Sequence, residues 1–147
     1  MEVPTSSLTD LMSKVGALVF HWSWLEQGLT DALRERFPAR AAGTFRERLA
    51  TWHELTAVTG KRQELASAAR DQALELRRVR NHVVHGLQSA GASPENGPPT
   101  ISCLIGGHDD PSAGTVTYTI DELEHFAQAI DACRRAFIRV ENFNYRL

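Results

Sequence analysis

Apolar residues recur at spacings of three and four over long stretches of this 147-residue chain, and this periodicity limits the possible folds more than any other feature. The first such stretch runs from Thr5 to about Phe37 and predicts one long helix, which Pro38 ends. Thr44 and Glu47 then form the sequence pattern of a capping box, in which two side chains satisfy the first backbone amides of a helix. A second helix is therefore predicted from Thr44 onward.

Two further helices are predicted in the second half of the chain. The third runs from Lys61 to about Leu87, and the fourth opens at a second capping box, Thr119–Glu122. Residues 88–98 are rich in Gly, Ser and Pro and are predicted to form a loop. Together these patterns predict a mainly α fold, an up-and-down bundle of four main helices in a single domain spanning residues 1–147.

Two short runs rich in β-branched residues, Thr100–Ile105 and Thr115–Ile120, lie between the third and fourth predicted helices. Turn-forming residues at 106–114 separate them, so the sequence predicts a β-hairpin at about residues 99–119, inserted between these two helices. A hairpin of this size is not stable alone, and we expect it to pack against the helices.

The charge of the chain is unevenly distributed. The formal net charge of −2 argues against a general nucleic-acid coat protein. Residues 34–80 nevertheless hold eleven Lys and Arg against six Asp and Glu, and fourteen of the sixteen basic residues in the chain are Arg. The Arg bias fits contact with phosphate, and it fits a GC-rich coding background equally well. A basic middle between acidic ends indicates a polyanionic ligand such as RNA or a nucleotide.

Several functional classes lack their sequence signals. No run of 18 apolar residues suggests a membrane span, and the N-terminus lacks the basic and apolar blocks of a signal peptide. Cys103 and Cys133 are far apart and are expected to be reduced thiols, which indicates a cytoplasmic protein. No Cys/His set has zinc spacing and no Gly-rich phosphate loop is present, so we expect neither a metal nor a cofactor.

The segment Arg77–Gly86 concentrates three arginines, one asparagine and two histidines within ten residues. Arg presents a planar fork that suits phosphate, and His exchanges protons near neutral pH, so such a set can bind and cleave a phosphodiester without a metal. On an unbroken helix Arg78, His82 and His85 lie within about 60° of each other, whereas Arg80 lies about 140° from His85. Joint action of Arg80 and His85 therefore requires the helix to bend or end between them, or a second subunit to contribute.

Helix capping is the alternative explanation of the same segment. A histidine near a helix C-terminus interacts favourably with the helix dipole, and a glycine just beyond it suits a left-handed cap. Capping accounts for His85 and Gly86. It leaves the three arginines and Asn81 without an explanation.

The spacing of these residues resembles a known motif. Arg80 is followed by four residues and then by His85, and Arg78 is followed by six residues and the same histidine. This pattern resembles the Arg-to-His motif of the HEPN superfamily. Its setting is similar too, because a long amphipathic helix is predicted before it, a Gly follows it and a further long helix is predicted near the C-terminus. These small helical proteins include many prokaryotic endoribonucleases. The resemblance covers the helical pattern of most of the chain and leaves out residues 89–119, which look like an insertion.

The resemblance implies a metal-independent endoribonuclease. In such an enzyme the 2′-hydroxyl of the substrate attacks its own 3′ phosphate, which leaves a 2′,3′-cyclic phosphate and a free 5′-hydroxyl. His85 would be the general acid or base, and Arg80, with Arg78 as its competitor, would hold the charged phosphorane. Asn81 would bind phosphate or orient a motif side chain. Arg78 is also a candidate for substrate binding, as are Arg77 and His82.

Glu26 is a candidate supporting residue on the first predicted helix. It follows a dense apolar run and so is expected to point into a helical interface, where it would orient an Arg or His of the motif. The alternative is an ordinary solvated glutamate.

The resemblance also bears on partners. Many HEPN enzymes are toxins or defence effectors with a neighbouring antitoxin. Other HEPN proteins have a nucleotidyltransferase as their partner, and some of these carry a Tyr two residues after the motif His. This chain has Leu87 at that position. Because each chain offers one motif His and the in-line step needs both an acid and a base, we expect a homodimer whose twofold axis passes near Arg80–His85. A non-catalytic HEPN-like module that binds a nucleotide or a protein is the alternative, which the acidic total charge favours slightly.

Overall fold

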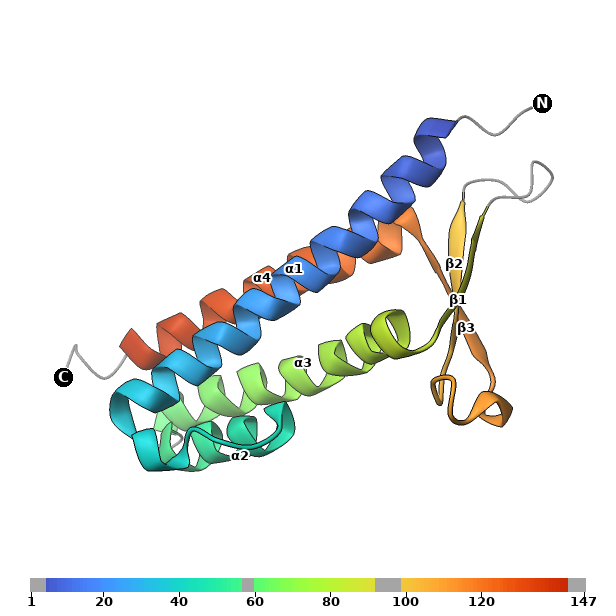
Figure 1. Cartoon of the computed structure of the whole chain (residues 1–147). Helices are drawn as coiled ribbons and strands as arrows, with labels where there is room; N and C mark the ends of the chain where they lie inside the picture. Colours follow the sequence, from blue (N-terminus) through green and yellow to red (C-terminus); the bar gives the residue numbers. More distant parts are fainter. Residues whose placement is uncertain (1–4, 57–59, 92–98, 143–147) are drawn as a thin grey trace. The chain divides into compact units, whose positions relative to one another are not determined.

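The computed structural model describes residues 5–56, 60–91 and 99–142, and within these residues the chain is mainly helical (Figure 1). The helices are α1 (Thr5–Arg36), α2 (Phe45–Thr56), α3 (Gly60–His85) and α4 (Ile120–Asn142), with two short 3₁₀ turns, η1 (Pro38–Arg40) and η2 (Pro111–Ala113). The strands are β1 (Leu87–Gly91), β2 (Thr100–Leu104) and β3 (Thr115–Thr119). The predicted four-helix fold with a β element between the third and fourth helices is confirmed.

The chain divides into two compact units, each built from two separate segments. Unit 1 comprises residues 1–21 and 77–128, and unit 2 comprises residues 22–76 and 129–147. The helices α1, α3 and α4 contribute residues to both units, and α2 belongs to unit 2. The expectation of a single domain stays a prediction, and the two units are described separately.

Unit 2 is a helical core to which all four helices contribute. Trp52 of α2 packs edge-on against Phe137 of α4, with 4.4 Å between ring centroids. The buried thiol of Cys133 on α4 lies 3.6 Å from the backbone oxygen of Ala69 on α3. The part of α1 in this unit buries the residues of its predicted apolar face, namely Trp22, Leu25, Leu29 and Leu33. The 3-and-4 spacing in the sequence therefore corresponds to a packed helix face.

Unit 1 combines the first part of α1, the end of α3, the sheet and the start of α4. The sheet is antiparallel in the order β1-β2-β3, and its central strand β2 buries Ile101, Cys103 and Leu104. The predicted hairpin is confirmed as β2 and β3, which are joined by a turn in which the Ile105 amide donates to the Gly114 carbonyl at 2.9 Å. The sheet thus supplies core residues to this unit.

The strand β1 was not predicted. Residues 88–91 were expected to form a loop, and the third helix was expected to end at about Leu87. In the structure α3 ends at His85, and β1 pairs with β2, with an irregular register near the start of β1. The prediction was wrong because β1 is an edge strand that is exposed after Leu87, so its residues show none of the apolar alternation that marks a half-buried strand.

Gly86 sits where the end of α3 meets the central strand. Its carbonyl accepts a hydrogen bond from the Leu104 amide at 2.7 Å, and its own amide donates to the His82 carbonyl at 2.9 Å. A Cβ atom at Gly86 would collide with the backbone oxygen of Leu104 and lie 2.9 Å from that of His82. The backbone of Gly86 is not in the left-handed region, so the left-handed cap interpretation is wrong. Gly86 is required because the backbone of β2 approaches too closely for any side chain.

The helix starts agree with the predicted caps. The Thr44 hydroxyl accepts a hydrogen bond from the Glu47 amide at 3.2 Å, just before α2. At α4 the capping box is complete: the Glu122 amide donates to the Thr119 hydroxyl, and the Thr119 amide donates to the Glu122 carboxylate, both at 3.1 Å. The start of α4 is therefore fixed directly after β3.

Within the described residues, no helix contains an apolar segment long enough to cross a membrane.

The close approach at Gly86 predicts a large effect of a single methyl group. Gly86→Ala should lower the free energy of unfolding by roughly 1–3 kcal/mol, because the added Cβ must push β2 away from the end of α3. The matched control is Gly16→Ala in α1, where an added Cβ meets nothing within 4 Å. It should be neutral or stabilising by up to about 1 kcal/mol. Urea denaturation followed by circular dichroism measures both, and a Gly86→Ala protein as stable as the wild type would contradict this account.

Candidate functional site

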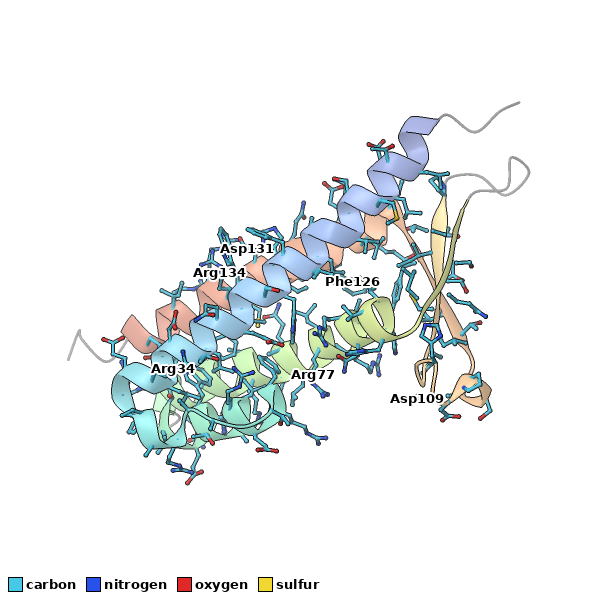
Figure 2. All side chains as sticks on the ribbon, in the orientation of Figure 1. Arg34, Arg77, Asp109, Phe126, Asp131 and Arg134 are labelled. Atoms are coloured by element: carbon cyan, nitrogen blue, oxygen red, sulfur yellow. The ribbon has the colours of Figure 1, made fainter. Side chains whose placement is uncertain are left out.

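The candidate site is formed by the last turns of α3, which lie in unit 1. Val79 and Val83 bury one side of this segment, with 5% and 2% of their surfaces exposed. The polar residues between them are half-buried or exposed, and Figure 2 shows Arg77 on this part of α3. Burial of the valine side therefore fixes which way the arginines and histidines face.

Arg80 and His85 are in contact. The Nη1 atom of Arg80 lies 3.3 Å from Nε2 of His85, and α3 is helical through both residues. The expectation that the helix must bend or end between them, or that a second subunit must contribute, is wrong. A long arginine side chain reaches a histidine that stands on the final residue of the helix, so one chain brings the two side chains together.

Asn81 holds the same arginine. Its Oδ1 atom accepts a hydrogen bond from Nη1 of Arg80 at 2.9 Å. Because a guanidinium only donates, both Asn81 Oδ1 and His85 Nε2 act as acceptors in this arrangement, which places the proton of a neutral His85 ring on Nδ1. The role predicted for Asn81, orientation of a motif side chain, corresponds to this contact.

His82 is held from the sheet by Tyr118 of β3. Its Nδ1 atom lies 2.8 Å from the Tyr118 hydroxyl, and the two rings are nearly parallel. Tyr118 is 5% exposed and packs edge-on against Phe126 of α4. Burial lowers the pKa of His82, and the charge of Arg78 lowers it further, so the neutral ring is favoured.

Tyr118 is the site residue that sequence reasoning missed. A signal was present, because alternation along the predicted strand places Tyr118 on the same face as Val116 and Ile120. A buried tyrosine hydroxyl requires a hydrogen-bond partner, and a histidine of the central motif was available.

The two other arginines of the motif also lie on α3. Arg78 is exposed and lies four residues before His82 on α3, so the two side chains are neighbours on one helix face. Arg77 is half-buried. Together with Arg80 they give the end of α3 a high density of positive charge.

Glu26 lies in unit 2 and has partners there. Its carboxylate accepts a hydrogen bond from the Trp22 indole at 2.6 Å and lies 3.9 Å from the guanidinium of Arg48, which also donates to the Thr30 hydroxyl. These contacts tie α2 to α1. An orienting role of Glu26 toward the motif stays a prediction.

A second histidine cluster lies in unit 2 and is formed by residues of α2 and α3. His53 lies 2.9 Å from the Ser67 hydroxyl through Nε2, and Arg70 donates to the ring, with Nδ1 the nearer nitrogen at 3.2 Å. His53 of α2 is thus held between two side chains of α3, Ser67 and Arg70. The cluster ties α2 to α3.

A groove also lies in unit 2. It has a volume of about 650 Å³ and is lined by half-exposed apolar side chains such as Trp24 and Ile138. Its arginines are engaged: Arg36 pairs with Glu141 at 2.9 Å, and Arg134, labelled with Asp131 on α4 in Figure 2, lies over the Trp24 ring. None of the motif residues lines this groove, so it is not the candidate site.

Neither cysteine is a reactive nucleophile. Burial raises the pKa of Cys103 to about 11 and that of Cys133 to about 12, so both thiols stay protonated at neutral pH. Among the residues that the structure describes, no group of three or more His, Cys, Asp or Glu side chains is arranged to hold a metal ion.

No model of a known protein family matches the chain, and comparison with curated proteins and with solved structures likewise gives no match.

The environment of His82 predicts its titration. We expect His82 to titrate below the ordinary value of 6.5, because burial and Arg78 disfavour its charged form. The imidazole of His82 therefore binds a proton more readily in the unfolded chain than in the folded one. Its contribution to the free energy of unfolding is complete above pH 6.5 and is lost as the pH falls through the pKa that His82 has in the folded protein. Titration of the imidazole resonances by NMR measures this directly.

Arg78→Ala tests the contribution of Arg78 to the pKa of His82. It should raise the pKa of His82 toward 6.5, because it removes a nearby positive charge. It should leave unchanged the pKa of His53, which burial and Arg70 lower in unit 2. A His82 ring that titrates at or above 6.5 in the wild type contradicts the described environment.

Proposed function

We propose that the chain is a metal-independent endoribonuclease whose site is the end of α3. The observation that carries the proposal is the contact between Arg80 and His85, at 3.3 Å, on an accessible part of the helix. One side chain is a permanent cation with a geometry suited to phosphate, and the other transfers protons at neutral pH. The HEPN resemblance of the motif spacing agrees with this assignment.

The proposed chemistry begins with phosphate binding to Arg80. In the free protein Nη1 of Arg80 donates to a neutral imidazole and to an amide oxygen. A phosphate oxygen carries negative charge and is the stronger acceptor, so it takes the place of His85. This exchange releases Nε2 of His85 for proton transfer, while Asn81 keeps Arg80 in position. Arg77 and Arg78 add positive charge along the substrate backbone.

The reaction is attack of a 2′-hydroxyl on the adjacent phosphorus. Charge develops on the phosphorane oxygens, where Arg80 stabilises it, and the products are a 2′,3′-cyclic phosphate and a 5′-hydroxyl. The step needs one group that removes a proton and one that delivers a proton. A homodimer whose twofold axis passes near Arg80–His85, which would bring two copies of the site together, is also part of the proposal.

The biological setting proposed here is that of a cytoplasmic toxin or defence effector, with an antitoxin or a nucleotidyltransferase as the partner protein. Both described cysteines are free and buried, which agrees with a reducing compartment. The rival function is a non-catalytic module that binds a nucleotide or a protein through the same arginines. Incubation of the purified protein with mixed RNA in the presence of a chelator separates the two functions.

Single substitutions test the assigned roles. His85→Ala should lower the cleavage rate by roughly 10²–10⁴-fold, the range expected for loss of a general acid or base. Arg80→Ala should lower the cleavage rate by roughly 10²–10³-fold, as expected for loss of one hydrogen-bond donor to a developing charge. Arg80→Lys should restore only part of the rate, because an ammonium group lacks the planar fork of a guanidinium. Single-turnover cleavage of a labelled RNA, with chelator present, gives these rates.

Two exposed residues provide matched controls. Arg46→Ala on α2 and His125→Ala on α4 remove the same side-chain types and should cleave like the wild type. Arg78→Ala decides between the two motif spacings: if it abolishes cleavage while Arg80→Ala does not, the assignment of Arg80 is wrong. If the wild type cleaves no RNA and still binds nucleotides through these arginines, the binding-module function replaces the nuclease.

A further inference from the structure

We propose that His82, held in place by Tyr118, is the general base of this site and that His85 is the general acid. The inference rests on the proposed function, because it assigns the two proton transfers of that reaction. It makes Tyr118 a positioning residue that acts through His82. The source of both proton-transfer groups is then a single chain.

The first support is the placement of the two histidines. His82 and His85 are three residues apart on α3, so they are neighbours on one helix face, with roughly 5–6 Å between their Cβ atoms. The proposal places the phosphate group of the substrate between the two rings. Arg80, the proposed phosphate ligand, already contacts one of them.

The second support is the way in which His82 is fixed. Nδ1 of His82 lies 2.8 Å from the Tyr118 hydroxyl, and this leaves Nε2 as the ring nitrogen that is not engaged by that contact. Tyr118 is itself held by burial and by the Phe126 ring at 5.7 Å. For Nε2 to act as a base, Nδ1 carries the ring proton and donates it to the Tyr118 oxygen, and the Tyr118 hydroxyl accepts this bond both before and after the proton transfer.

The third support is the protonation state. Two groups that act on His82 are Arg78 on α3, through its charge, and Tyr118 on β3, through its hydrogen bond. Burial and Arg78 lower the pKa of His82, so the ring is neutral at neutral pH and ready to accept a proton. A carboxylate, which would hold the ring in its charged form, is not among the causes of this shift.

The proton balance of the step is complete. Nε2 of His82 takes the proton of the 2′-hydroxyl while the 2′-oxygen forms a bond to phosphorus. The bond between phosphorus and the 5′-oxygen breaks, and a protonated His85 delivers its proton to that oxygen. Exchange with water then removes the proton from His82 and returns one to His85. A homodimer is not required for this acid–base step.

The experiment compares two variants on two substrates. His82→Asn keeps an amide near the position of Nδ1, which can still bond to Tyr118, and removes Nε2. His85→Ala removes the proposed acid. Each is assayed on an oligoribonucleotide with one cleavable bond and on the same oligoribonucleotide in which the bridging 5′-oxygen is sulfur. A thiolate leaves without a proton, so the sulfur substrate needs a base and no acid.

We expect both variants to cleave the oxygen substrate roughly 10²–10⁴-fold more slowly than the wild type. On the sulfur substrate His85→Ala should recover most of the wild-type rate, whereas His82→Asn should stay slow. In the pH profile of kcat/KM, His82→Asn should lose the acidic limb, which reports the free base. Tyr118→Phe should lower kcat by about tenfold or less, as for one hydrogen bond, and shift the acidic limb without raising KM. His125→Asn is the matched control and should behave like the wild type.

The results of this experiment tell a wrong assignment of the base apart from a wrong proposed function. If His82→Asn cleaves the oxygen substrate at the wild-type rate while His85→Ala does not, the nuclease stands and the base is elsewhere, with a second copy the first candidate. If the sulfur substrate rescues His82→Asn and leaves His85→Ala slow, the two roles are reversed. If the wild type cleaves neither substrate, the proposed function and this inference both fall. Circular dichroism of each variant shows that loss of activity is not loss of folding.

Discussion

The close backbone contact between Gly86 and Leu104 is the constraint on which the candidate site depends. The amide of Leu104 donates to the Gly86 carbonyl at 2.7 Å, and no side chain fits at position 86. This contact ends α3 at His85 and sets the start of β1. It also fixes the sheet against the helix, so that Tyr118 of β3 reaches His82. Without it, His85 would not stand on the final helical residue, where Arg80 can reach it.

The polar groups of the site satisfy one another in the free protein. Arg80 donates to Asn81 and to His85, and His82 bonds to Tyr118. Such pairing holds each ring and the guanidinium in a defined position and lowers the reorganisation needed when substrate binds. The two histidines are held from different directions, one by an arginine of its own helix and one by the sheet. This difference is the physical basis for giving them different roles as acid and base.

Local patterns in the sequence were sufficient to predict the helices. Thr119 and Glu122 form the capping box that their spacing predicts, and α1 ends just before Pro38. Long-range contacts were not predictable in the same way. The partners His82 and Tyr118 are 36 residues apart, and the contact depends on the register of β2 and β3. Helix geometry alone placed Arg80 away from His85, because it ignores the reach of an arginine side chain to the end of the helix.

The central claim is that Arg80 and His85 promote attack by a ribose 2′-hydroxyl on phosphorus. The most direct test is an oligoribonucleotide with a single cleavage site, compared with the same oligomer carrying one 2′-deoxy nucleotide on the 5′ side of that bond. The account predicts that the all-ribose oligomer, with chelator present, yields a 2′,3′-cyclic phosphate by mass spectrometry and that the 2′-deoxy oligomer stays intact. Cleavage of the 2′-deoxy oligomer at the same bond, or a product that carries a 5′-phosphate, would contradict it.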